Sequence, residues 1–274
     1  MRQRLSSLLF AGLSCLGALP VAAHEFWLQA SPSMLAAGGN SELTLRVGEN
    51  FDGEQTPFVD ERTVALRHYV AGTVTDLAAR LPRRTAVPTL AVPLPAGTSL
   101  ITFDSQPIEF SLSADTFHAY LHEEGLDHII ERRKAAGKET TPGRERYRRH
   151  VKTLLRAGAA SDGTYALRTG QRMEITPLSD PFAAAPGATL RVKLTFDGKP
   201  LPDVLVKGWH RHRDQSQLLI IRARTNAAGE VGLSLPYAGG WMVSAVHMQA
   251  AQGTANADWD SFWGNLTFTL PGAQ

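Results

Sequence analysis

The sequence is nearly without cysteine, since its 274 residues include a single one, Cys15. One thiol excludes an internal disulfide framework and every multi-cysteine zinc or iron–sulfur site. Long apolar runs are also scarce: beyond residue 23 there is no stretch of about 18 apolar residues, so we expect no membrane span there. Excess charge is missing as well, with 28 basic and 26 acidic residues. This near balance gives no reason to expect nucleic acid as the partner of the whole chain.

Catalytic signatures are absent too. The sequence contains no Gly-x-Ser-x-Gly elbow, no phosphate loop and no dinucleotide fingerprint. Residues 118–122 read His-Ala-Tyr-Leu-His and therefore lack the glutamate of a His-Glu-x-x-His metalloprotease. We therefore expect a protein that is not an enzyme.

The first 23 residues are typical of a secretory signal peptide. Arg2 and Arg4 form a basic start, residues 5–19 are apolar, and small residues precede a cut after Ala23. Its removal leaves 26 basic and 26 acidic residues and no thiol, which suits an oxidising compartment. The pattern predicts export to the periplasm. A lipoprotein acylated at the cysteine is an alternative, although the residues before it match a lipobox poorly.

The remainder predicts a mainly β protein. Short alternating runs with Gly and Pro between them, such as residues 41–47 and 63–70, are typical of antiparallel sandwiches. We expect an N-terminal β-sandwich over residues 24–112, a helical insert over 113–163 and a second β-sandwich over 164–274.

The insert is expected to hold helices and to be basic. Asp115 is a plausible N-cap for a first helix, and Pro142 marks the start of a second. In that second segment apolar residues at 147, 151, 154 and 155 have helical spacing. Between residues 131 and 156 ten Lys or Arg face three Glu. An anionic partner is one interpretation; the favoured one is a solvated helix face whose arginines pair with the acidic remainder.

Any transition-metal site must be built from the nine histidines and from carboxylates. Cleavage after Ala23 would make His24 the first residue, and its amine and imidazole could chelate one ion. Nickel, cobalt, copper and zinc all accept such nitrogen ligands. The alternative is that His24 merely follows a cleavage site.

Five further histidines are candidate metal ligands. His118 and His122 would share one helix face, and His210 and His212 one strand face, although two arginines adjoin the latter pair. His247 lies on an apolar stripe, which is more typical of a core histidine.

Several motifs in order resemble one known family. They are Ala-His-Glu-Phe-Trp (23–27), Arg-Val-Gly-Glu (46–49), Phe-x-x-Tyr-Leu-x-Glu-Glu-Gly-Leu (117–126), Gly-Arg-Glu-Arg-Tyr (143–147), Lys-Thr-Leu-Leu-Arg (152–156), Gly-Lys-Pro-Leu-Pro (198–202), Ala-Val-His-Met (245–248) and Asp-Trp-Asp-Ser-Phe-Trp (258–263). The chain is similar to a domain-of-unknown-function family of bacterial secreted proteins labelled as periplasmic components of cobalt/nickel uptake. The resemblance implies a transthyretin-like C-terminal half.

The family's histidines match His24 and His247, which become the leading metal ligands together with the carboxylate of Asp258. The histidines at 118, 122, 210 and 212 rank lower. The resulting hypothesis is a periplasmic binding protein for a divalent transition metal (Ni, Co, Cu or Zn) that delivers it to a membrane transporter component. Two alternatives stay open: an envelope interaction module with incidental histidines, and a copper-dependent oxidase with an N-terminal histidine.

Overall fold

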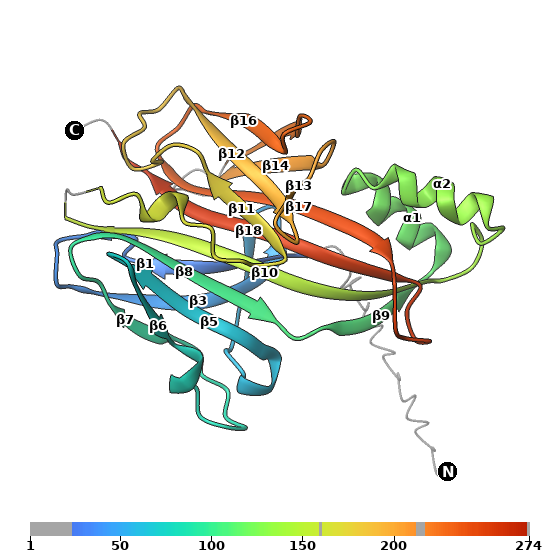
Figure 1. Ribbon diagram of the computed structural model, residues 1–274, viewed down its shortest axis with the longest axis horizontal. Helices are drawn as coiled ribbons and strands as arrows, with labels where there is room; N and C mark the ends of the chain where they lie inside the picture. Colours follow the sequence, from blue (N-terminus) through green and yellow to red (C-terminus); the bar gives the residue numbers. More distant parts are fainter. Residues whose placement is uncertain (1–23, 159–160, 212–216, 273–274) are drawn as a thin grey trace, which may run out of the picture.

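A long mixed sheet forms the centre of the molecule in the computed structural model, which describes residues 24–158, 161–211 and 217–272. The strand order is β15-β14-β17-β18-β10-β8-β5-β6, and β2 and β9 also pair with β10. In chain order these strands are β2 (Met34–Leu35), β5 (Thr63–Val70), β6 (Thr73–Asp76), β8 (Gly97–Ser105), β9 (Ile108–Leu112), β10 (Gly143–Ala157), β14 (Leu205–Arg211), β15 (Leu218–Arg224), β17 (Gly239–Ala250) and β18 (Trp259–Leu270). Figure 1 shows this sheet running through the molecule between smaller layers. The prediction of a mainly β fold is confirmed.

Two smaller sheets flank the central one. One has β3 between β1 and β4 with β7 also on β3, and the other has β12 between β11 and β13 with β16 also on β12. Their strands are β1 (Glu25–Ser31), β3 (Asn40–Glu49), β4 (Asp52–Thr56), β7 (Leu90–Pro93), β11 (Met173–Pro177), β12 (Ala188–Phe196), β13 (Lys199–Pro200) and β16 (Glu230–Leu235). Single 3₁₀ turns cover Asp60–Arg62, Ala78–Arg80 and Thr164–Ala166.

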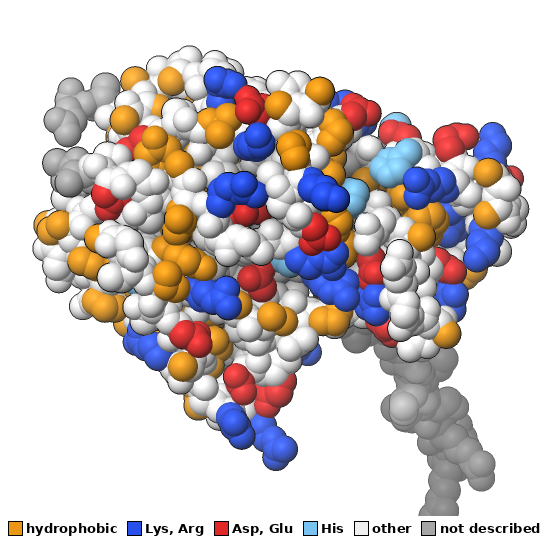
Figure 2. All heavy atoms as spheres, viewed as in Figure 1, with side chains coloured by type: hydrophobic (Ala, Val, Ile, Leu, Met, Phe, Trp, Pro, Cys, Tyr) orange, Lys and Arg blue, Asp and Glu red, His pale blue; other side chains and the backbone are white. Residues whose placement is uncertain are grey.

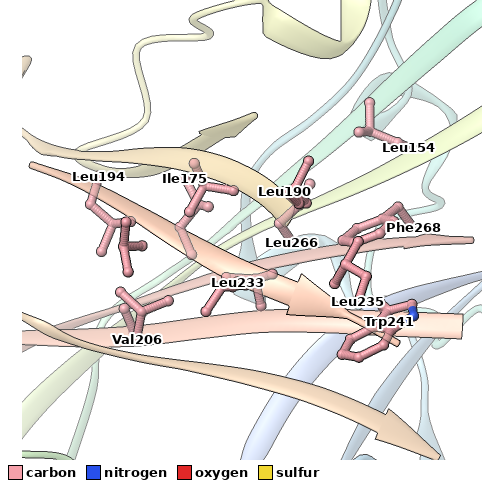
Figure 3. Packing of buried hydrophobic residues seen from close by; sticks show 14 of the residues in the cluster. Leu154, Ile175, Leu190, Leu194, Val206, Leu233, Leu235, Trp241, Leu266 and Phe268 are labelled. Carbon is pink, nitrogen blue, oxygen red and sulfur yellow. The ribbon is translucent and has the colours of Figure 1, made fainter. Parts of the chain in front are cut away.

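Each face of the central sheet carries its own hydrophobic core. One core joins β14, β17 and β18 to β11, β12 and β16, and Figure 3 shows its side chains, among them Val206, Trp241 and Leu266, pointing toward one another. The second core joins β5, β8 and β10 to β1, β3 and β7. Because strand side chains alternate between faces, Leu154 of β10 enters the first core while Leu155 enters the second.

Two short helices, α1 (Ala114–Glu123) and α2 (Asp127–Ala135), cover the end of the sheet beside β10 and β18 (Figure 1). The N-cap of α1 is Ser113, whose Oγ accepts the Thr116 amide at 3.3 Å, and not Asp115 as the sequence suggested. The helices pack on Trp259 and Trp263 of β18.

The prediction of a second helix after Pro142 is wrong. Residues 143–157 form β10, a 15-residue strand that pairs in parallel with β18. Four of its five arginines and its lysine pair with carboxylates at positions 174, 180, 258 and 260, but they do so from a largely buried strand and not from a solvated helix face. Figure 2 shows Lys and Arg interspersed with Asp and Glu on the visible face. Strands from both predicted β regions share the central sheet.

The predicted signal peptide over residues 1–23, with Cys15, lies outside the described residues. Within the described part, no helix combines the length and the apolar character needed to cross a membrane.

Candidate functional site

His24 lies at the start of β1, beside the end of β3. The β1–β3 pairing aligns Glu25 with Gly48, and this register brings Nε2 of His24 to 3.1 Å from Oε1 of Glu49. The His24 side chain is 21% exposed and the Glu49 side chain 63%. Among the described residues, none forms a hydrogen bond with Nδ1 of His24. The carboxylate therefore lies beside Nε2 of the ring and not beside Nδ1.

An acidic pocket of about 100 Å³ adjoins this pair. Its lining includes Glu25, Glu49 and Glu123, with Lys207 as the opposing cation. Nζ of Lys207 lies 3.5 Å from Oε1 of Glu25 and 2.6 Å from Oε1 of Glu124. One lysine thus faces two buried carboxylates, and the neighbourhood of His24 is electronegative.

Burial governs the protonation of this cluster. It raises the pKa of Glu124 to about 7, against the pull of Lys207. Burial also opposes the charge on Lys207, but Glu124 and Glu25 outweigh it and leave the pKa of Lys207 raised. A cation near His24 would therefore meet carboxylates that the single lysine only partly neutralises.

His247 lies on β17 with its ring half buried against Phe196, at 4.4 Å between centroids. Burial lowers the pKa of His247 to about 4, and His128 and Arg172 add to the effect. The imidazole is neutral at pH 7, as a metal ligand must be. Phe196 and Phe262 lie against the ring, and His128, Asp197 and Arg172 are close enough to act on its charge.

Asp258 precedes β18 and is already engaged by cations. Nε and Nη2 of Arg144 donate to its two oxygens at 3.0 Å each, and Nζ of Lys138 lies 3.4 Å away. These interactions, above all the hydrogen bond from Arg144, lower the pKa of Asp258. Two cations at this carboxylate would repel a metal ion.

The lower-ranked histidines have other partners. His118 accepts a hydrogen bond at 3.3 Å from Nε of Arg133, and Nδ1 of His122 lies 2.6 Å from Asp127. His210 is buried, with Nδ1 3.0 Å from the carbonyl oxygen of Gly240. His212 lies outside the described residues.

The structure does not bring the leading ligands together. Glu25, next to His24, contacts Ser244 of β17, whereas His247 is three residues further along that strand and so lies on its opposite face. Across residues 24–158, 161–211 and 217–272, no group of three His, Cys, Asp or Glu side chains could hold a metal ion.

Sequence reasoning missed the partner of His24 and the buried ionic clusters. Glu49 appeared in a motif, but its approach to His24 depends on strand pairing. Lys207 and Glu124 are each at most 3% exposed, although adjacent carboxylates such as Glu123-Glu124 are too common in sequences to indicate a site. No local pattern marks these positions, because the partners come from distant elements.

Comparisons with known proteins show similarity at the level of a family. No curated protein matches the sequence. Among solved structures, Salmonella alpha-2-macroglobulin matches 91% of this chain and 25% of its own length, with 10% identity and a TM-score of 0.25. The Hoc outer capsid protein of bacteriophage RB49 matches 90% of this chain and 59% of its own length, with 12% identity and a TM-score of 0.18. The chain thus spans less than two thirds of either solved structure. TM-scores this low support no conclusion about fold or function. A family model described as a domain of unknown function (DUF4198) matches residues 21–249.

Proposed function

Because the chain belongs to the DUF4198 family, whose description names no function, we propose from the geometry that it binds a divalent transition metal at the start of β1. In this proposal residues 1–23 are removed on export to the periplasm. The amine and Nδ1 of His24 then chelate the ion. The protein binds the ion and does not transform it.

The observation that carries the proposal is the 3.1 Å contact between Nε2 of His24 and Oε1 of Glu49. A histidine that binds metal through one ring nitrogen usually donates its other N–H to a carboxylate, which fixes the tautomer and makes the imidazole more basic. Glu49 is in that position, and Nδ1 is the nitrogen left for the ion. The electronegative pocket beside it favours a cation.

The donor set determines which ions fit. An amine and an imidazole nitrogen suit nickel, cobalt, copper and zinc, and do not suit calcium or magnesium. Nickel or cobalt, with delivery to a membrane transporter component, is the narrower form of the proposal, and it rests on the family resemblance. His247 and Asp258 are not part of this site.

Calorimetric titration with nickel and with copper tests the proposal on protein whose first residue is His24, verified by mass spectrometry. We expect saturable binding that weakens as pH falls, because the amine and the imidazole must lose their protons to bind. Glu49→Gln should weaken binding by about 10–100-fold, the usual cost of losing such a carboxylate partner. His247→Gln is the matched control and should bind as the parent does.

One additional residue before His24 supplies the decisive comparison. It moves the terminal amine away from the imidazole and leaves every side chain unchanged. Equal affinity with and without that residue would refute the terminal chelate.

A further inference from the structure

Arg149 of β10 is a buried cation without a polar partner for its guanidinium. The residue is 7% exposed, and its backbone amide donates to Oγ of Ser105 at 2.9 Å. Within the described ranges, no group accepts a hydrogen bond from the guanidinium and no carboxylate lies within 4.0 Å of it. Other arginines of β10, such as Arg144 and Arg146, each have a carboxylate partner.

Aromatic rings surround this guanidinium. Its central carbon lies 4.5 Å from the ring centroid of Trp263, 4.9 Å from that of Tyr147 and 5.7 Å from that of Phe26. Ring faces attract the positive charge, but they do not replace acceptors for five N–H donors. Burial lowers the pKa of Arg149, and nearby groups such as Tyr147, Glu25 and Glu145 oppose the change. Burying a charged group without hydrogen-bond acceptors is energetically unfavourable, so a ligand that supplies acceptors would be favoured here.

A pocket of about 170 Å³ opens beside Arg149. Phe26, Leu45, Val47 and Phe103 give it apolar walls. At its mouth lies the exposed residue Arg62. A cavity of about 150 Å³ lined by apolar side chains accommodates benzene, so the space fits one six-membered ring or a short branched chain.

We propose that this pocket binds a small carboxylate with an apolar body, such as one aromatic ring or a short branched chain. The carboxylate accepts hydrogen bonds from the Arg149 guanidinium, whose planar fork matches two oxygens. The apolar body fills the space between Phe26, Val47 and Phe103. Arg62 at the mouth attracts the anion as it approaches. The site does not need a metal, although Phe26 and Val47 are each two residues along their strands from His24 and Glu49.

An inorganic anion fits the pocket poorly. Hydrated phosphate needs several donors, whereas Arg149 is the one buried cation among the lining residues, and the hydroxyl groups of Thr63 and Ser105 already donate to backbone carbonyls. The chemistry therefore favours an organic acid over phosphate.

Calorimetric titration of the folded chain with benzoate, benzamide and phosphate tests this proposal. Benzoate should bind saturably, and benzamide and phosphate at least about tenfold more weakly, as expected when a hydrogen bond to a charged group is lost. Arg149→Gln should reduce benzoate binding to the level of benzamide. Arg172→Gln is the control, because Arg172 also stacks on two rings but pairs with Asp197 elsewhere.

Val47→Phe provides a second variant that leaves Arg149 in place and fills the pocket. It should abolish benzoate binding, and it keeps the test intact if Arg149→Gln does not fold. Equal binding of benzoate and benzamide, unchanged binding by Val47→Phe, or no benzoate binding to the parent would each overturn the proposal. Tighter binding of phosphate than of benzoate would refute the inference that the ligand has an apolar body.

Discussion

Glu145 is a buried carboxyl group whose protonation should control how stability depends on pH. Its side chain is 0% exposed. The Tyr120 hydroxyl donates to Oε1 at 3.2 Å, and Ser261 contacts the same oxygen. Oε2 has no hydrogen-bond partner among the described residues. Burial raises the pKa of Glu145 from 4.5 to about 7, although the hydrogen bonds from Ser261 and Tyr120 oppose the change.

The raised pKa of Glu145 determines the direction and the size of the change in the free energy of unfolding with pH. Between pH 4.5 and about 7 the folded chain holds a proton on this carboxyl group that the unfolded chain has released, so stability falls as pH rises. The stabilisation is fully present below pH 4.5 and is lost through pH 7. Linkage over pH 5 to 8 gives a loss of about 2.5 kcal/mol in the free energy of unfolding from this one group.

Glu145→Gln removes the titration and retains the shape of the side chain. We expect the free energy of unfolding of the variant to fall by about 2.5 kcal/mol less than that of the parent between pH 5 and pH 8. The measurement is urea denaturation at several pH values, with stability obtained by linear extrapolation. Glu61→Gln, at an exposed position, should follow the parent. Parallel pH curves for Glu145→Gln and the parent would refute the reasoning.

Three further predictions follow from the packing and the buried groups. Lys207→Met leaves two buried carboxylates without their cation and should lower the free energy of unfolding by about 3–5 kcal/mol in urea at pH 8; a loss below about 1 kcal/mol would contradict it. Gly143→Ala places a methyl group on the buried Phe117 ring and should cost about 1–3 kcal/mol, seen as a lower Tm, whereas an unchanged Tm would show that the ring moves aside freely. Because burial lowers the pKa of His247 to about 4, its imidazole resonances should stay constant from pH 8 to pH 5.5, and an inflection near pH 6.5 would disprove that environment.

Some strands were predictable from alternating apolar residues. The alternation over residues 63–70 coincides with β5, and that over residues 41–47 lies within β3. Residues 143–157 were predicted as a helix because β10 is covered on both faces, so its apolar residues need not alternate. Val151 and Leu155 enter one core and Leu154 the other, which by coincidence reproduces helical spacing.

The candidate sites were predictable only in part. The sequence indicates His24 through the expected cleavage site, but Glu49 becomes its neighbour only through the pairing of β1 with β3. Arg149 lies in a basic run in which neighbouring arginines look alike, and alternation on β10 decides which of them meets a carboxylate and which meets aromatic rings. The local sequence therefore indicates neither the partner of His24 nor the aromatic surroundings of Arg149.

The parallel pairing of β10 with β18 has a consequence for how the chain folds. It joins residues such as Arg146 and Asp260, which are 114 positions apart, and both hydrophobic cores share β10. Contacts so distant in sequence raise the contact order and slow folding. Neither β region can complete its sheet alone, so the two should unfold together in one cooperative transition. A fragment of either region would present unpaired strand edges, the usual template for aggregation.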